Sequence, residues 1–210
     1  MRLIDISPSL SPASPHWPAD TPYSAERTWV LGGNCPVNVS KVEFSTHAGA
    51  HADAPFHYDS AGAPIDKVSL EPYIGPCTVL HAFGVRHVLA ADALADKAGG
   101  RELRPRVLIR FYERAPQTEW DPRFPAIAAD AVCWLADRGA ILIGVDTPSL
   151  DPQSSKLMDA HHAAHARDLR ILEGLVLDDV EEGDYELIAP PLKLAGLDAA
   201  PVRAVLRTLR

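Results

Sequence analysis

Long apolar segments separated by turn-forming residues dominate the pattern of hydrophobic and polar positions along this chain. They lie at residues 76–83, 107–111, 141–145 and 171–177, and such segments predict buried strands. The segments 87–98 and 127–137 have helical composition, and each ends near a glycine, as helices commonly do. Apolar strands that alternate with helices indicate an α/β fold with a partly parallel central sheet, covered on both faces.

Shorter strand-like segments and a proline-rich loop complete the pattern. Further strands are expected at residues 3–6, 27–30, 37–44, 185–188 and 201–209. The segment 7–22 contains five prolines, whose missing N–H groups cannot join a sheet or a helix, so it predicts a long ordered loop. Trp17 in this loop either closes over a flat ligand or packs the loop onto the protein's own core or onto a partner chain. Because no internal repeat or linker is found, we expect one domain spanning residues 1–210.

Composition and charge exclude several classes of function. The 210-residue chain is 47% hydrophobic and 23% charged, which is typical of a globular protein with a sizeable core. Its net charge of −8 argues against a nucleic-acid-binding surface, because neutralising phosphates requires an excess of Lys and Arg. The sequence has no apolar run of about 18 residues and no secretory signal pattern, so we expect a cytoplasmic protein that does not interact with membranes.

The three cysteines give no sign of a metal or redox motif. Cys35, Cys77 and Cys133 are widely spaced and form no CxxC pair. We therefore expect reduced thiols, with Cys35 as a buried structural residue rather than a nucleophile.

Residues 47–57 read HAGAHADAPFH and carry three imidazoles and a carboxylate among mostly small residues. In a strand, His51 and Asp53 share a face about 6–7 Å apart and can hold one ion, but His47 lies too far along the chain. In a helix, His47 and His51 are neighbours, but His51 and Asp53 point apart. We therefore predict an irregular turn, bent at Gly49, that carries a metal or catalytic site rather than a polar surface loop.

Two further features lie in the C-terminal part of the chain. Glu173 is a lone carboxylate within an apolar strand, and burying its charge is costly unless a cation pairs with it or a metal binds it. A salt bridge to Arg or Lys is the alternative role. The polar, helix-forming segment 154–170 precedes this strand and carries His161, His162 and His165.

The remaining chemistry points to a metal. The chain has no GxSxG, Walker A or GxGxxG motif, which argues against a serine hydrolase, an NTPase or a dinucleotide enzyme. Oxygen and nitrogen donors without a thiolate suit Zn, Mn, Fe or Ni. Three histidines and two carboxylates exceed what one tetrahedral catalytic ion needs, which favours two ions about 3.5–4 Å apart. Such a pair supplies hydroxide at neutral pH for attack on a carbonyl carbon, with a nearby histidine to protonate the leaving group.

The segment 47–57 resembles HxGTHxDxPxH, the signature of the cyclase family of metal-dependent hydrolases. More narrowly, the chain is similar to the bacterial kynurenine formamidase (arylformamidase) branch of that family. Ala50 departs from the signature, which usually has Thr at this position. Because this residue is not a ligand, the departure affects the residues that support the ligands and not the ligands themselves. The stretches that carry the resemblance beyond the signature are Asp5-Ile6-Ser7, the proline-rich segment with Trp17, Gly144–Ser149, Ser154-Ser155-Lys156, Ala160-His161-His162 and Leu172-Glu173-Gly174.

The resemblance implies two zinc ions per subunit, with Mn2+ or another divalent ion as the alternative. The ligands it implies are His47, His51 and Asp53 for one ion, and Asp53, His161 and Glu173 for the other. Asp53 and Glu173 would then bridge the two ions. His162 is the rival of His161, because only the phase of the helix decides between them.

The resemblance also implies an activity and an assembly. The reaction is hydrolysis of N-formyl-L-kynurenine to L-kynurenine and formate, a step of tryptophan degradation in the kynurenine pathway. It proceeds by attack of a hydroxide held by two zinc ions, with His57 as the acid/base residue and Trp17 lining the substrate pocket. The implied fold is the three-layer swivelling β/β/α type, and the implied assembly is a homodimer.

Three alternatives stay open at this stage. A related dinuclear hydrolase would open a cyclic amide or lactone such as isatin at the same site. A mononuclear Fe(II) oxygenase would use His51, Asp53 and one distant histidine as a facial triad, but would leave His47 and Glu173 without roles. A non-catalytic metal-binding protein would use the same ligands for stability alone.

Overall fold

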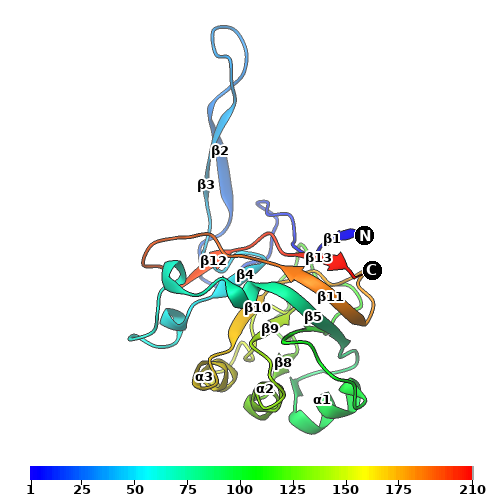
Figure 1. Cartoon of the computed structure of the whole chain (residues 1–210). Helices are drawn as coiled ribbons and strands as arrows, with labels where there is room; N and C mark the ends of the chain where they lie inside the picture. The colour runs from blue at the N-terminus through cyan, green and yellow to red at the C-terminus, as the bar shows by residue number, and fades with distance from the viewer. Residues whose placement is uncertain (210) are drawn as a thin grey trace.

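A computed structural model describes residues 1–209 of the chain. Its main feature is a nine-stranded sheet in the order β1-β13-β11-β5-β7-β9-β10-β4-β12 (Figure 1). The strands are β1 (Leu3–Asp5), β13 (Val205–Thr208), β11 (Gly183–Ile188), β5 (Ile74–His81), β7 (Arg106–Arg110), β9 (Leu142–Val145), β10 (Arg170–Glu173), β4 (His51–Asp53) and β12 (Ala199–Pro201).

The middle of this sheet confirms the predicted partly parallel α/β fold. Strands β5, β7, β9 and β10 pair in parallel, and the other pairs of the sheet are antiparallel. Every residue of β7 and β9 is buried, as expected for parallel strands that are covered on both faces.

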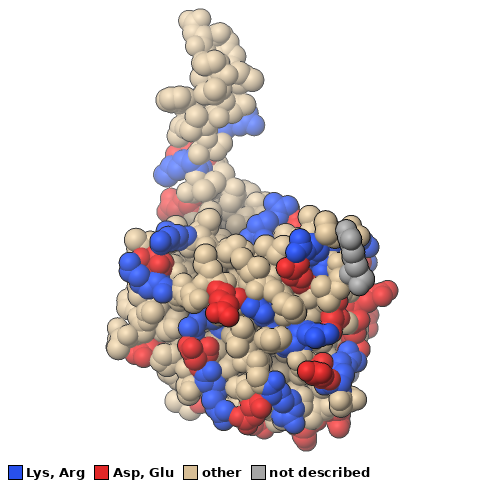
Figure 2. All heavy atoms as spheres, viewed as in Figure 1, with Lys and Arg blue, Asp and Glu red and all other residues tan. Residues whose placement is uncertain are grey.

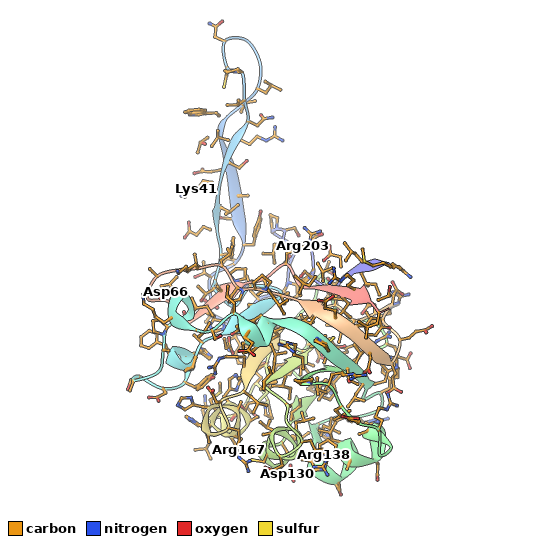
Figure 3. The ribbon with its side chains drawn as sticks, in the orientation of Figure 1. Lys41, Asp66, Asp130, Arg138, Arg167 and Arg203 are labelled. Carbon is orange, nitrogen blue, oxygen red and sulfur yellow. The ribbon has the colours of Figure 1, made fainter. Side chains whose placement is uncertain are left out.

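Three short helices cover one face of the sheet. Helices α1 (Ala91–Ala98), α2 (Ala129–Ala136) and α3 (Asp159–Ala166) lie side by side below the parallel strands (Figure 1). They bury Leu94, Leu135 and Ala164 against apolar residues of the sheet. Charged residues lie on this outer side, such as Asp130 in α2, and Arg138 and Arg167 just after the ends of α2 and α3 (Figure 3).

Helices α1 and α2 begin later than the sequence predicts. The segments expected as their first turns instead form β6 (Val88–Leu89) and β8 (Ala126–Ile127), which pair in parallel. The composition of these segments favours a helix, but backbone pairing between two distant parts of the chain overrides that preference. The glycine signal at the end of α1 is confirmed, because Gly99 has a φ of 59° in the left-handed region.

The sheet curls so that its two edges come close together. The predicted C-terminal strand at 201–209 divides into β12 and β13, which lie at opposite ends of the strand order, and only residues 202–204 connect them. The connecting residues bond to other segments, since Val202 N donates to Ala50 O at 2.9 Å and Ile6 N donates to Ala204 O at 3.0 Å. The curl encloses a second core around Tyr73 and Leu172 on the face opposite the helices.

A long hairpin projects from the body of the molecule. Strands β2 (Ser24–Trp29) and β3 (Val39–Glu43) pair only with each other, and every residue of both is exposed. The outer part of this hairpin carries no Lys, Arg, Asp or Glu (Figure 2). Cys35 lies in its tip and is only half-buried, so the expectation of a buried structural thiol is wrong. The reason is that the tip projects away from the body of the molecule (Figure 1).

The proline-rich segment 7–22 forms no helix or strand, as predicted. Trp17 packs edge-on against Trp120, with ring centroids 5.3 Å apart, and Phe124 is the next aromatic neighbour at 6.1 Å. These contacts hold the loop against the body of the protein. None of the helices within residues 1–209 is both long enough and apolar enough to cross a membrane.

Gly174, directly after β10, lets two parts of the chain approach closely. Its φ is 64°, and a Cβ atom at this position would lie 2.8 Å from the carbonyl carbon of Gly49. Gly49 also has a left-handed φ of 62°, and it forms the bend that the sequence predicts. The close approach of these two glycines sets the position of the turn at 47–50 relative to Glu173.

We predict that Gly174→Ala lowers the free energy of unfolding by about 2 kcal/mol or more, because a methyl group cannot fit against the Gly49 carbonyl without a backbone shift. Gly99→Ala is the matched control, since Gly99 has a similar φ of 59° and open space around its Cα. It is expected to cost about 1 kcal/mol from the backbone conformation alone. Urea unfolding measures both values, and equal losses would contradict the steric argument.

Candidate metal centre

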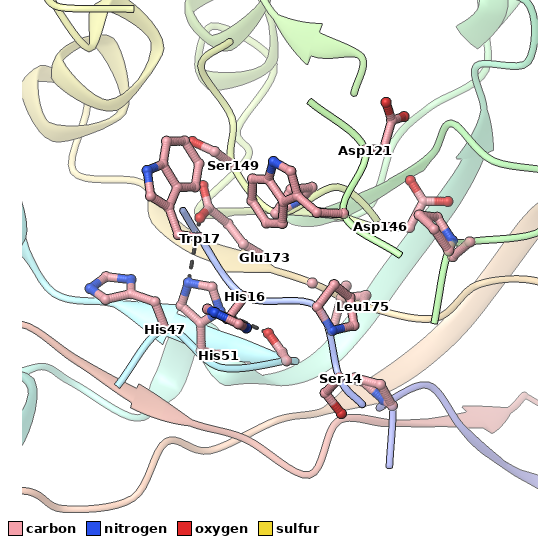
Figure 4. A pocket seen from close by; sticks show the side chains of 18 of the residues that line it. Ser14, His16, Trp17, His47, His51, Asp121, Asp146, Ser149, Glu173 and Leu175 are labelled. Atoms are coloured by element: carbon pink, nitrogen blue, oxygen red, sulfur yellow. Dashed lines mark hydrogen bonds and ion pairs between the residues drawn. The ribbon is translucent and has the colours of Figure 1, made fainter. Parts of the chain in front are cut away.

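Three of the predicted ligands lie on one face of two paired strands. In the antiparallel pair β10/β4, Glu173 is directly opposite His51, and Ile171 is opposite Asp53. Residues opposite each other, and residues two apart along a strand, share a face of the sheet. His51, Asp53 and Glu173 therefore point to the same side, and Figure 4 shows His51 directed towards Glu173.

His161 is brought to the same place by the start of α3. The carboxylate of Asp151 accepts hydrogen bonds from the backbone N–H groups of Ala160 and His161, both at 3.1 Å, which anchors the first turn of the helix. Asp151 Oδ2 also lies 2.6 Å from His161 Nδ1. With Nδ1 engaged, His161 Nε2 points at the two carboxylates of the cluster. His162, the rival candidate, is exposed on the outer side of the helix, which decides between the two histidines.

His47 reaches the cluster from the turn before β4. Its Nδ1 lies 3.1 Å from Asp53 Oδ1, and its Nε2 lies 2.9 Å from Asp198 Oδ2. The predicted irregular turn is thus present, although its second half is regular, because His51 and Asp53 belong to a strand.

The five side chains form a compact cluster, in which four are buried and the fifth, His47, is 21% exposed. His51 Nε2 lies 3.4 Å from both Asp53 Oδ1 and Glu173 Oε2. His161 Nε2 lies 3.4 Å from Asp53 Oδ2 and 3.3 Å from Glu173 Oε1. His51, Asp53, His161 and Glu173 are each at most 3% exposed.

Several polar atoms at the centre of the cluster have no hydrogen bond. Within residues 1–209, His51 Nε2 and both carboxylate oxygens of Asp53 are buried without a hydrogen-bonding partner. Leaving such groups unsatisfied costs about 1–3 kcal/mol each, and more for a charge. One ligand atom each from His51, Asp53 and Glu173 lies within 4.8 Å of the others, as do ligand atoms of His47, Asp53 and His57. Oxygen and imidazole donors in this arrangement fit divalent cations.

The electrostatics also favour positive charge in the cluster. Burial lowers the pKa of His47 and His51, but their bonds to carboxylates outweigh burial and raise the two pKa values to about 10 and about 9. Burial raises the pKa of Asp53, but its contacts with His161, His47 and His51 hold that pKa well below its usual value. In the metal-free protein the imidazoles therefore retain protons, which metal ions would displace on binding.

His57 lies beside the cluster but is more accessible. It ends the short 3₁₀ helix η1 (Pro55–His57), and its ring centroid lies 4.3 Å from that of His47. Its side chain is 29% exposed, compared with 21% for His47. Burial lowers the pKa of His57, so the ring is neutral at neutral pH and can accept a proton.

The cluster opens into a cavity of about 350 Å³ that His47, His51, His57 and Glu173 line. Trp17 and Trp120 form its aromatic part, and the Trp120 indole N–H donates to Gln153 Oε1 at 2.8 Å, which fixes that ring. Asp121 and Asp146 lie on the opposite side of the cavity from His47 and His51 (Figure 4). The cavity therefore combines an end with histidines and carboxylates, an aromatic wall and an acidic end.

The cluster brings together the predicted ligands His47, His51, Asp53, His161 and Glu173, with His57 and Trp17 at its edges. Glu173 contacts histidines instead of the Arg or Lys of the alternative interpretation. The sequence does not predict two further carboxylates of the site. Asp151 contacts the outer nitrogen of His161, and Asp198 contacts that of His47. Asp151 follows the Asp-Thr-Pro-Ser stretch closely enough to have been noticed, but no sequence pattern marks Asp198.

This chain belongs to the cyclase family. The family model named Cyclase matches residues 4–152, which include the segment 47–57. His161 and Glu173 lie beyond the matched residues, so their place in the site comes from the structure.

Solved structures agree with this assignment. A potential metal-dependent hydrolase with cyclase activity is 26% identical, with a TM-score of 0.82, and the match covers 98% of this chain and 96% of the other. A predicted metal-dependent hydrolase from Bacillus stearothermophilus is 26% identical, with a TM-score of 0.81 and coverage of 98% and 97%. Isatin hydrolase A from Ralstonia solanacearum is 24% identical, with a TM-score of 0.82 and coverage of 98% and 91%, and shows the shared fold. Family, fold and cluster together support a metal-dependent hydrolase.

We predict that His161→Ala weakens metal binding at least tenfold, because it removes a buried nitrogen that faces both carboxylates. His162→Ala, the adjacent and exposed control, is expected to leave metal binding unchanged. Metal content after gel filtration and a zinc titration of the metal-free protein measure the difference. Equal metal binding by the two variants would contradict the assignment of His161 to the cluster.

Proposed function

We propose that this protein hydrolyses N-formyl-L-kynurenine to L-kynurenine and formate, as an arylformamidase that depends on two divalent metal ions. The observation that carries this proposal is a cluster of three histidines and two carboxylates, four of them buried and His47 half-buried, that opens into an aromatic cavity. Zinc is the expected metal, and Mn2+ is also compatible with nitrogen and oxygen donors.

The geometry of the two carboxylates supports two ions rather than one. Asp53 Oδ1 faces His47 and His51, whereas its Oδ2 faces His161. The two oxygens of Glu173 also face different histidines: Oε2 faces His51 and Oε1 faces His161. His47, His51 and Asp53 would hold one ion, and Asp53, His161 and Glu173 would hold the other.

The metal ions would supply a nucleophile at neutral pH and polarise the formyl carbonyl. The chain itself supplies the proton transfer. His57 Nδ1 lies 3.6 Å from Asp198 Oδ2, which leaves Nε2 as the nitrogen that delivers a proton to the arylamine leaving group. The accessibility of His57 from the cavity supports this role.

The aromatic part of the cavity supports an aryl substrate. Trp17 and Trp120 present large apolar surfaces beside the cluster, and an aromatic ring packs well against either. The buried His51 and Glu173 at the polar end favour a small reacting group, and a formyl group is the smallest acyl group.

The acidic end of the cavity supports a substrate with an ammonium group. Asp121 and Asp146 line this end, and none of the described residues lining the cavity is Lys or Arg. Burial raises the pKa of Asp146 to about 7, so this carboxyl group is only partly ionised at neutral pH. Tyr112 lies between them, donating its hydroxyl to Asp121 Oδ2 at 3.0 Å and its backbone N–H to Asp146 Oδ2 at 3.1 Å. The ammonium group of formylkynurenine suits this environment, and isatin has no such group, but the α-carboxylate beside it meets no Lys or Arg among the described lining residues.

Hydrolysis of a cyclic amide such as isatin is the second candidate, favoured by the similarity in fold to isatin hydrolase A. Two other classes fit less well. A mononuclear Fe(II) oxygenase would need only one carboxylate and two histidines, but five donors converge in the cluster. A non-catalytic metal-binding protein would have no use for a cavity that leads to its ligands.

We predict that the metal-loaded protein hydrolyses formylkynurenine with a kcat/KM at least tenfold above that for isatin, and that a chelator abolishes both activities. Product absorbance under steady-state conditions measures the two rates. A preference for isatin would overturn the formamidase proposal, while leaving the hydrolase assignment intact.

His57→Ala is the companion variant for this assay. It is expected to keep its bound metal and to lose activity by about 10²–10⁴-fold, which is the usual contribution of a positioned general acid or base. Loss of metal together with activity would instead make His57 a ligand.

We also propose that the protein is a homodimer in which the hairpin β2–β3 contacts a second copy of the chain. Trp29, Val30, Leu31 and Val42 are between 52% and 59% exposed on this hairpin. An isolated two-stranded hairpin is only marginally stable in water, and a large exposed apolar surface usually marks an interface. Because its outer part is uncharged, the hairpin suits an equally uncharged surface such as its own copy.

We predict that Leu31→Ser weakens self-association at least tenfold, because it places a polar group in the apolar contact. Leu3→Ser, at a similarly exposed leucine on β1, is the control and is expected to leave assembly unchanged. Light scattering coupled to gel filtration gives the mass over a range of concentrations. A wild-type protein that is monomeric at all concentrations would overturn the proposal.

A further inference from the structure

Asp198 connects the C-terminal part of the chain to the metal centre. It lies immediately before the edge strand β12, whose Ala199 is opposite Asp53 in β4. The backbone carbonyl of Asp198 accepts a hydrogen bond from Ala54 N–H at 2.8 Å. The backbone of Asp198 is therefore fixed beside the residue that supplies the central carboxylate of the cluster.

The Asp198 side chain makes two hydrogen bonds and also lies near His57, whose Nδ1 is 3.6 Å from Asp198 Oδ2. Its Oδ1 accepts a hydrogen bond from the Thr46 hydroxyl at 3.1 Å, and its Oδ2 lies 2.9 Å from His47 Nε2. The side chain is 38% exposed, so solvent alone could satisfy it. It nevertheless contacts both Thr46 and His47.

The three histidines of the cluster share one arrangement. In each ring one nitrogen faces a cluster carboxylate, while the other is occupied by an oxygen outside the cluster. For His51 this oxygen is the Gly49 carbonyl at 2.9 Å, and for His161 it is Asp151 Oδ2 at 2.6 Å. For His47 it is Asp198 Oδ2, and the nitrogen facing the cluster is Nδ1 rather than Nε2.

We infer that Asp198 is a positioning residue, which fixes the ring of His47 so that its Nδ1 is free to bind a metal ion. When Nε2–H donates to Asp198, the proton of the neutral ring is on Nε2 and the lone pair of Nδ1 points at the cluster. The negative charge of Asp198 also makes the imidazole a stronger ligand. This inference depends on the proposed metal centre and not on the identity of the substrate.

A purely structural role is the competing explanation. Asp198 lies 151 residues from His47 in the sequence, and its contacts also attach the segment before β12 to the turn before β4. If that attachment is its whole role, removing the carboxylate lowers the stability of the metal-free protein and leaves metal affinity unchanged. Metal affinity and stability therefore distinguish the two roles.

The test is a zinc titration of metal-free protein in competition with a chromophoric chelator, at constant pH. Asp198→Ala is expected to weaken the affinity of at least one zinc ion by about 10–100-fold, the usual effect of losing such a partner. Asp198→Asn keeps an acceptor for His47 Nε2–H but loses the charge, so a smaller loss is expected. If Asp198→Ala does not fold, Asp198→Asn alone still tests the inference.

Asp59→Asn is the matched control. Asp59 Oδ2 lies 3.0 Å from His165 Nε2, and both side chains are 37% exposed, so this is the same kind of pair, but His165 contributes no nitrogen to the cluster. Its zinc affinity is expected to equal that of the wild type. The absorption spectrum of the cobalt-substituted protein gives a second readout, which should change in Asp198→Ala and not in Asp59→Asn.

Zinc affinity of Asp198→Ala within about twofold of the wild type, with an unchanged cobalt spectrum, would overturn the inference. Because neither measurement uses a substrate, failure of the formamidase proposal would leave these results unaffected. Conversely, a protein that hydrolyses formylkynurenine but shows no effect of Asp198→Ala would refute only the role of Asp198.

Discussion

The burial of Asp53 and Glu173 beside three imidazoles is the constraint on which the rest of the structure depends. Two carboxylates this close repel each other, and neither has a Lys or Arg partner among the described residues. Such a group of charges is stable only with positive charge at its centre, supplied by protons on the histidines or by metal ions. The surrounding strands and helix hold these groups together despite the repulsion between the two carboxylates.

The fold provides this support from four directions. Strand β4 presents two ligands on one face, and β10 presents Glu173 directly opposite one of them. The first turn of α3 presents His161, and the contact of Gly174 with Gly49 sets the turn that carries His47. Strands and packed helix ends are rigid, which suits a site that must hold its geometry. The outer carboxylates Asp151 and Asp198 then orient the rings.

Much of the architecture could be predicted from the sequence because burial leaves a strong pattern. The four strands of the parallel middle of the sheet read as long apolar segments, and all four were found near their observed positions. The short pair β6/β8 and the division of the last strand could not be found this way. Their formation depends on which distant segments lie nearby, which local composition does not record.

The sequence by itself indicated the chemistry of this protein: residues 47–57 and the lone Glu173 predict a metal site, because closely spaced imidazoles and carboxylates are ligands that divalent cations prefer. Only the tertiary structure decided which residues meet. The helix phase selects His161 over His162, and the register of β10 on β4 sets Glu173 against His51. Asp198 reaches His47 only because the sheet curls and places β12 beside β4. Donor types are local properties of the chain, whereas distances between segments far apart in sequence exist only once packing has fixed them.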